Sequence, residues 1–269
     1  MSLDLTSKTA VITGAGSGIG RETALACARR GAALALCDID EAGLAQTADA
    51  ARALGAEVLT ARVDVADPDD MDAFAAQVDH VDLLVNNAGI GVFGLFVDTE
   101  LEDWRRLLDI NVMGVVHGCR SFVPRMIERG RGGHVVNLSS QAGIQASPAL
   151  PAYSASKFAV FGFSEALRTE LKPHGIGVTA VCPGIINTPI TRNSTARGTN
   201  IDARREKVVK LYERRNYGPE KVAVRILRAV ERDRAVAPIA PEAHIAYVMS
   251  RLAPPLSRWV AAKMAAMAD

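Results

Sequence analysis

No stretch of the 269-residue sequence approaches the roughly 18 apolar residues that a membrane-spanning helix needs. The first residues also lack a positively charged start followed by an apolar segment, so we expect a cytoplasmic protein without a secretion signal. The formal net charge is only +1, and aromatic residues make up only 5% of the chain. These two values argue against a protein that binds nucleic acid through a basic or base-stacking surface.

Cysteine and histidine are scarce and scattered. Four cysteines are present, and their spacing shows no pairs: Cys27, Cys37, Cys119 and Cys182. The five histidines include no His-x-x-x-His pair. We therefore expect neither a disulfide framework nor a metal site, and we interpret the cysteines as small core residues in a reducing compartment.

Hydrophobic residues, in contrast, make up 49% of the chain, which is enough for a large core. Short apolar runs alternate with longer amphipathic stretches, and this alternation predicts an α/β fold with a parallel sheet between two layers of helices. The expected strands are residues 9–13, 33–37, 57–63, 81–86, 134–139, 177–182 and 235–240. The amphipathic stretches include residues 20–30, 41–54, 101–128 and 152–171, and we expect the last two to be long helices. Since no linker interrupts this pattern, residues 1–269 should form a single domain.

Two parts of this pattern stand out. Pro238 cannot donate a ladder hydrogen bond, so the last strand should lie at an edge of the sheet. Residues 192–234 carry 13 Lys and Arg against 6 Asp and Glu. This segment is either a solvated helical face or a basic flap and helix on the substrate side of a site.

A glycine-rich loop, TGAGSGIG, follows the first strand at residues 13–20. Glycines at such a strand-to-helix turn permit a sharp bend, and the helix start offers N–H groups that suit a pyrophosphate. Asp38 ends the next strand, where the dinucleotide fingerprint requires an acid. Its carboxylate can accept both ribose hydroxyls and would repel a 2′-phosphate, which favours NAD over NADP. Alternatively Asp38 could cap the next helix, but Asp40 is better placed for that.

The stretch PAYSASKFAV, residues 151–160, places Tyr153 and Lys157 four positions apart. On a helix the two side chains lie on one face, and a lysine cation would lower the pKa of the phenol. Taken alone, the pair is either a proton-transfer site or two ordinary helix residues. Further motifs at the ends of predicted strands favour the first interpretation: Ser140 after VVNLS, NNAG at residues 86–89 and CPG at residues 182–184.

Together these motifs resemble the short-chain dehydrogenase/reductase family, from about residue 4 to residue 240. The shared motifs are TGxxxGxG, NNAG, a serine 13 residues before the tyrosine, YxxxK, and PGxxxT at residues 183–188. The resemblance implies a Rossmann-type, doubly wound parallel sheet of seven strands in the order 3-2-1-4-5-6-7. The segment between Val65 and Asp82 is shorter than is usual in the family, so the third helix or its turn should be trimmed.

Carried over residue by residue, the resemblance assigns Tyr153 as the acid/base, Lys157 as the group that lowers its pKa and holds the nicotinamide ribose, and Ser140 as a hydrogen-bond donor to the substrate oxygen. Asn111 matches an asparagine that supports a water in the proton relay. The implied NAD contacts are Gly14, Ser17, Gly18, Ile19, Gly20, Asp38, Asp64, Val65, Asn87, Ala88, Gly89, Tyr153, Lys157, Pro183, Gly184, Ile186 and Thr188.

The residues expected to face the substrate are mostly apolar: Ile90, Val92, Phe93, Ile144, Ile185, Pro189 and Ile190. They favour a hydrophobic secondary alcohol or ketone, or a lipid-like alcohol or aldehyde, and no arginine clamp for a phosphate is evident. Two alternatives stay open: an NADPH-dependent carbonyl reductase, against which Asp38 argues, and a non-catalytic dinucleotide sensor, against which the intact Ser140, Tyr153 and Lys157 argue.

Two expectations concern partners. The helices at 101–128 and 152–171 are the pair through which the family usually associates, which implies a homotetramer or homodimer. The tail, residues 241–269, carries a helical apolar stripe with basic neighbours: Leu256, Trp259, Val260, Met264 and Met267. This stripe could pack on its own subunit, cover a neighbour's pocket, or contact a membrane weakly from the side.

Overall fold

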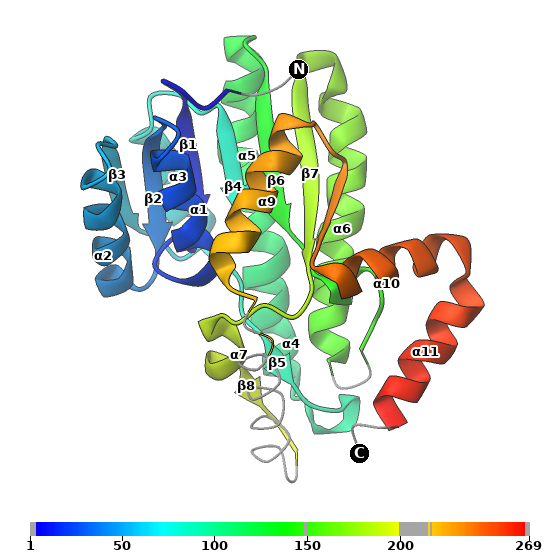
Figure 1. Cartoon of the computed structure of the whole chain (residues 1–269). Coiled ribbons are helices and arrows are strands. Elements are labelled where there is room, and N and C mark those ends of the chain that lie inside the picture. Colours follow the sequence, from blue (N-terminus) through cyan, green and yellow to red (C-terminus); the bar gives the residue numbers. More distant parts are fainter. Residues whose placement is uncertain (1–3, 148–149, 199–214, 216, 267–269) are drawn as a thin grey trace.

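The structure is a computed structural model that describes residues 4–147, 150–198, 215 and 217–266. Seven strands form one sheet in the order β3-β2-β1-β4-β6-β7-β9, and all neighbours are parallel (Figure 1). The strands are β1 (Thr9–Thr13), β2 (Ala33–Asp38), β3 (Val58–Arg62), β4 (Leu83–Asn86), β6 (Gly133–Leu138), β7 (Ile176–Pro183) and β9 (Val236–Ile239). The predicted fold and strand order are confirmed. Pro238 lies in β9 at the edge, opposite Cys182 of β7.

Helices cover both faces of this sheet because successive strand residues point to opposite sides. Ile12 packs among residues of α1, α2 and α9, whereas Val11 packs among residues of α3, α5 and α6. These helices are α1 (Gly18–Ala28), α2 (Glu41–Arg52), α9 (Pro219–Glu231), α3 (Pro68–Ala76), α5 (Gly114–Arg129) and α6 (Pro151–Leu171). The nine residues of α3 agree with the expected short third helix. All four cysteines are buried and free.

The expectation of one helix over residues 101–128 is wrong. The segment divides into α4 (Leu101–Leu108), a π-helical turn (Asp109–Met113) and α5. Such a turn inserts an extra residue into a helix and often occurs at functional sites. Here it carries Asn111, whose side chain bonds the backbone of Ile90 on another segment. Helical periodicity cannot reveal this tertiary contact.

The remaining elements lie near the carboxyl ends of the strands (Figure 1). They are the short paired strands β5 (Val92–Phe93) and β8 (Thr195–Ala196), and the helices α7 (Pro189–Asn193), α10 (Pro241–Leu252) and α11 (Pro254–Ala266). Of the basic segment, α9 is an amphipathic helix with one buried face, which agrees with the solvated-face interpretation. Residues 199–214 of the expected flap lie outside the described residues. Within the described chain, no helix is long and apolar enough to cross a membrane.

Candidate active site

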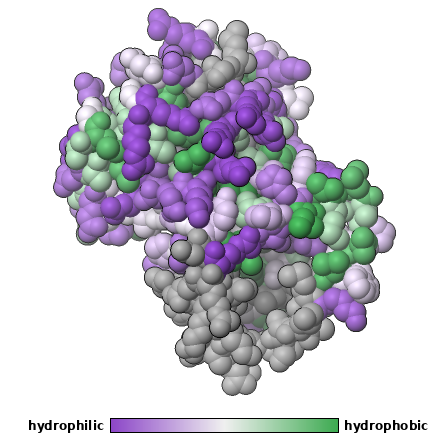
Figure 2. Space-filling model, in the orientation of Figure 1, coloured by the Kyte–Doolittle hydropathy of each residue, from purple (hydrophilic) through white to green (hydrophobic). Residues whose placement is uncertain are grey.

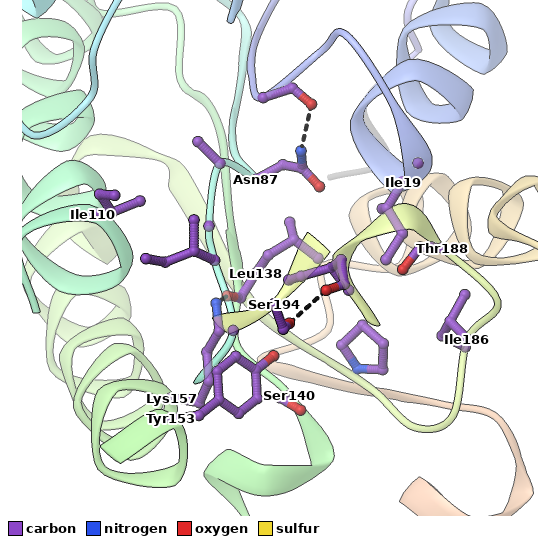
Figure 3. A pocket seen from close by; sticks show the side chains of 18 of the residues that line it. Ile19, Asn87, Ile110, Leu138, Ser140, Tyr153, Lys157, Ile186, Thr188 and Ser194 are labelled. Carbon is purple, nitrogen blue, oxygen red and sulfur yellow. Dashed lines mark hydrogen bonds between the residues drawn. The ribbon is translucent and has the colours of Figure 1, made fainter. Parts of the chain in front are cut away.

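A cavity of about 570 Å³ follows the carboxyl ends of the parallel strands, the edge at which open α/β sheets bind ligands. All the site residues expected from the sequence line it except Gly20 and Asn111: Gly14, Ser17, Gly18, Ile19, Asp38, Asp64, Val65, Asn87, Ala88, Gly89, Ser140, Tyr153, Lys157, Pro183, Gly184, Ile186 and Thr188. Figure 3 shows the side chains of Tyr153, Lys157 and Ser140 at one end, and Ile19 and Thr188 across the cavity from them.

The glycine loop shapes one wall through its backbone. Gly14 has a φ of +64°, and a Cβ there would come within 2.7 Å of the Ala88 Cα. After Ser17, α1 begins without an acidic residue in its first turn, and the Ser17 side chain does not cap it. The first N–H groups of α1 therefore present an electropositive surface that favours an anion.

Asn87 and Gly20 support this loop from behind. The Asn87 Nδ2 donates hydrogen bonds to the carbonyl oxygens of Thr13 and Gly14, both at 2.9 Å. Figure 3 shows one of these bonds. A Cβ on Gly20 would lie 2.1 Å from the Gly14 oxygen, so close packing requires glycine there. Gly20 thus serves the loop without lining the cavity.

Asp38 lies at the far end of the cavity from Tyr153 and is fixed to the glycine loop. Its Oδ2 accepts a hydrogen bond from the Gly16 N–H at 2.7 Å, and its Oδ1 accepts one from the Asp40 N–H at 2.9 Å. Asp40 caps α2 by accepting from the Gly43 N–H at 3.2 Å, as expected. Asp38 is therefore not the cap of α2, and its carboxylate faces the cavity.

Tyr153 and Lys157 project from the first turns of α6. The Lys157 side chain is almost wholly buried, its Nζ donates to the Leu138 oxygen at 2.9 Å, and it lies 5.6 Å from the centroid of the Tyr153 ring. Burial lowers the pKa of Lys157 to about 8, because desolvation disfavours the cation. Ser139 fastens this part of the helix by donating to the Lys157 oxygen at 2.8 Å.

Ser140 and Asn111 complete the predicted set, in different ways. The Ser140 Oγ lines the cavity and accepts from the Ala142 N–H at 3.1 Å. Asn111 is fully buried behind the wall, where its Oδ1 accepts from the Ile90 N–H at 2.8 Å. Its Nδ2 donates to the Ile90 oxygen and to the Ser156 Oγ. The side chain of Asn111 thus holds Ile90, which does line the cavity.

The substrate end is more polar than the sequence predicted. Ile90, Phe93, Ile185, Pro189 and Ile190 line it, but Val92 packs with Leu107 and Ala152, and Ile144 packs beside Phe161. Both were therefore wrongly expected to face the cavity. The prediction missed several polar side chains in the wall: Arg106, Gln141, Gln145, Ser147 and Ser194.

Gln145 is the most informative of these because it ties the wall to the C-terminal helix. Its Nε2 donates to the oxygen of Ser257 at 2.9 Å and to the Ser257 Oγ at 3.1 Å. Ser257 lies on α11, 112 residues away along the chain. No local sequence pattern could have indicated this contact.

The cavity as a whole fits a dinucleotide. One end offers an acid beside a glycine loop, the middle offers open backbone at a helix N-terminus, and the other end offers a tyrosine and a buried lysine. These features match a ribose, a pyrophosphate and a reacting ring in order. Among the described residues, no group of three or more potential metal ligands occurs.

Comparisons with known proteins agree with this geometry. A family model described as short chain dehydrogenase matches residues 8–198. The chain is 41% identical over 254 residues to SadH of Mycobacterium tuberculosis, a protein named as an oxidoreductase, and the match covers 91% of this chain and 90% of SadH. The chain therefore belongs to the short-chain dehydrogenase family.

Two further similarities bear on its organisation. EphD of Mycobacterium tuberculosis, also named as an oxidoreductase, is 47% identical over 252 residues, which cover 90% of this chain but only 43% of EphD. The chain thus spans less than half of that relative. A short chain dehydrogenase/reductase from Burkholderia phymatum, solved in complex with NAD, superposes with a TM-score of 0.87 at 33% identity and covers 95% of this chain and 97% of that one.

Proposed function

We propose that this protein transfers a hydride between NAD(H) and a hydrophobic secondary alcohol or ketone, or a lipid-like alcohol or aldehyde. The observation that carries the proposal is a single cavity with Tyr153, Lys157 and Ser140 at one end and Asp38 with the glycine loop at the other. A bound nicotinamide supplies the hydride acceptor or donor, and the protein supplies the rest.

Tyr153 is the acid/base. Its phenol gives a proton to the substrate oxygen during reduction, and its phenolate takes a proton from the substrate hydroxyl during oxidation. The Lys157 cation lies beside the ring and favours the phenolate. Ser140 donates a hydrogen bond to the same substrate oxygen. We assign Asn111 a positioning role, because its side chain is occupied by Ile90 and Ser156.

Asp38 makes NAD the preferred cofactor. A 2′-phosphate at this end of the cavity would meet a carboxylate that the Gly16 N–H holds in place. The NAD complex of the Burkholderia phymatum relative supports this preference. The alternative of an NADPH-dependent reductase would need a cation near Asp38, where the cavity instead presents the neutral Ser17 and Ile39.

We also propose a homotetramer or homodimer. Several large apolar side chains on α4, the π-helical turn and α6 are at least 40% exposed: Leu101, Leu108, Met113 and Phe158. Burying such side chains between copies would remove apolar surface from water. A monomer by light scattering at micromolar concentration would contradict this part of the proposal.

The tail offers a second exposed apolar surface. Ser257 holds α11 to Gln145 of its own chain, yet Leu256 and Trp259 are 50% and 59% exposed. Figure 2 shows hydrophobic side chains gathered over α10 and α11. We propose that the stripe contacts another copy of the chain, and sedimentation with anionic vesicles tests the weak peripheral membrane contact instead. Met267 of the expected stripe lies outside the described residues.

A panel of hydrophobic alcohols and ketones, assayed with each cofactor by the absorbance of reduced nicotinamide, tests the proposed reaction. Tyr153→Phe is the matched variant, since it removes only the hydroxyl. We expect turnover to fall by at least about a thousandfold, within the range for a general acid/base, while the dissociation constant for NADH changes less than about threefold. Turnover of Tyr153→Phe within a factor of a few of wild type would overturn the mechanism.

A further inference from the structure

The loop that follows β7 contributes Gly184, Ile185, Ile186 and Thr188 to the cavity wall, and acceptors on distant segments hold it. Gly184 N–H donates to the Ile239 oxygen at 2.9 Å, and Asn187 N–H donates to the Tyr217 oxygen at 3.0 Å. Between them, Ile185 N–H donates to the Glu242 Oε1 at 2.8 Å. Glu242 is thus the side-chain member of a three-point attachment.

Glu242 is built for this contact. It lies in the first turn of α10, where the helix dipole favours a carboxylate. Its Oε1 accepts from Ile185, while its Oε2 forms an ion pair with Arg215. A Cβ on Gly184 would lie 2.3 Å from the Glu242 Oε1, so the absence of a side chain at Gly184 is what lets the carboxylate approach the loop.

The backbone before Glu242 supports the same interpretation. Ala240 joins β9 to α10 with φ +81° and ψ 152°, a conformation that is nearly restricted to glycine. Ala240 is also buried. Strain of this kind persists where the surrounding structure requires it, and here it sets the direction in which α10 leaves the sheet. That direction brings Glu242 over Gly184 and Ile185.

We propose that Glu242 is a positioning residue for the nicotinamide end of the cofactor, acting through the Ile185 N–H to fix the loop that carries Ile186 and Thr188. This inference rests on the proposed function, which places the nicotinamide against those two residues. Glu242 does not line the cavity among the described residues, so it acts through the loop and not on the ligand. Arg215 orients the carboxylate from the opposite side.

Two substitutions separate the reach of this side chain from its charge. Glu242→Asp keeps the charge and the favourable helix position but shortens the side chain by one C–C bond, about 1.5 Å, so the carboxylate no longer reaches Ile185. Glu242→Gln loses the charge but keeps an oxygen that can accept from the Ile185 N–H. Glu231→Asp is the control, because Glu231 forms a comparable ion pair with Arg30 away from the cavity.

The readout is binding, measured by calorimetry with NADH and with ADP-ribose, which lacks the nicotinamide. We expect Glu242→Asp to bind NADH at least about tenfold more weakly, as the loss of a charge-assisted hydrogen bond implies, and to bind ADP-ribose within about twofold of wild type. Glu242→Gln should lie within about threefold of wild type for both ligands. Glu231→Asp should change neither.

Each other result overturns the inference. Equal weakening of NADH and ADP-ribose by Glu242→Asp would show a general distortion of the fold. Unchanged NADH binding would show that the loop does not depend on Glu242. A Glu242→Gln variant as weak as Glu242→Asp would show that an oxygen accepting from the Ile185 N–H does not hold the loop. If wild-type protein binds neither ligand, the proposed function itself is wrong and the inference falls with it.

Discussion

The two ends of the cavity are built in different ways. At the Asp38 end, the wall is mainly backbone from short segments that follow β1, β2 and β4. There Asn87 bonds the Gly14 oxygen and Asp38 bonds the Gly16 N–H. At the substrate end, the wall combines side chains from segments far apart in the sequence, such as Gln145 and Ser257. The first end is determined by local geometry and the second by tertiary packing.

This difference has a consequence for substitution. At the Asp38 end, an added carbon atom meets backbone that cannot move. At the substrate end, a changed side chain meets other side chains that can adopt new rotamers. We therefore expect large, all-or-none effects at the first end and graded effects among the side chains that surround the substrate, while substitutions of Tyr153 and Lys157 should cause the largest losses of activity.

Lys157→Met should cause the largest change and should act in opposite directions on activity and stability. Turnover should fall to background, because the cation beside Tyr153 is lost. The cofactor-free protein should become more stable by about 2 kcal/mol at pH 7. Removing a buried lysine with a pKa of about 8 relieves a cost of about 3 kcal/mol, and losing its hydrogen bond to Leu138 destabilises the variant by about 1 kcal/mol. Urea unfolding measures this gain.

The pH dependence of that gain tests its cause. Because the folded-state pKa of Lys157 lies below its ordinary value of 10.5, unfolding takes up a proton between about pH 8 and 10.5. The cost of burying the cation is fully present below pH 8 and disappears as the pH rises toward 10.5. The stability difference between Lys157→Met and wild type should therefore shrink over this window, and a constant difference would contradict the assignment.

Gly14→Ala should weaken dinucleotide binding about a hundredfold or more, as measured by the dissociation constant. The substitution forces a side chain into a backbone with φ +64° and places its Cβ 2.7 Å from the Ala88 Cα. Gly55→Ala is a matched control, because Gly55 has φ +87° but nothing within 4 Å of the added carbon. Gly55→Ala should lose about 1 kcal/mol of stability from backbone strain, and Gly14→Ala should lose more because of the added clash with Ala88. Only Gly14→Ala should lose ADP-ribose binding. Equal binding by the two variants would remove Gly14 from the cofactor wall.

Asp38→Asn should change cofactor preference by about tenfold. Wild type should prefer NAD over NADP by at least about 1.4 kcal/mol, from repulsion of the 2′-phosphate. The asparagine oxygen can still accept from the Gly16 N–H and hold the glycine loop, while the charge and the hydrogen bond from the Asp40 N–H are lost. Fluorescence quenching with both cofactors measures the two dissociation constants. If wild type binds NAD and NADP equally, Asp38 does not select the cofactor.

The same contrast explains what could be predicted from sequence. The edge position of Pro238 and the places of Gly14 and Asp38 follow from patterns within a few residues of a strand end. Such patterns report local backbone geometry, which parallel strands then bring to one edge. The strand order and the roles of Tyr153 and Lys157 follow instead from the resemblance to the family.

What could not be predicted depends on distant contacts. The π-helical turn forms where Asn111 bonds Ile90, and Val92 turns into the core because Leu107 and Ala152 cover it. An alternating pattern does not show which of two apolar neighbours faces a cavity. The position of the Gln145 side chain likewise depends on a hydrogen bond to Ser257 on α11, 112 residues away in the sequence.

The last prediction concerns the substrate end of the cavity, where we expect graded effects of substitution. Gln145→Ala and truncation after Pro255 both remove the hydrogen bonds between Gln145 and Ser257. We expect each to raise the KM for the alcohol or ketone about threefold and to leave the dissociation constant for NADH unchanged, because neither residue supports the glycine loop. Truncation should also lower the melting temperature by a few degrees, since the burial of Ser257 is lost.

Combining Gln145→Ala with the truncation shows whether the two changes act through the same contact or independently. If Gln145 acts through Ser257, adding Gln145→Ala to the truncated protein should change the KM no further, whereas two independent contributions would multiply to about ninefold. A truncated protein with unchanged KM and melting temperature that no longer sediments with anionic vesicles would instead assign the tail to a membrane surface. If the truncation or Gln145→Ala weakened NADH binding more than it raised the KM for the substrate, the division of the cavity would be wrong. In that case α11 would support the end that binds the cofactor.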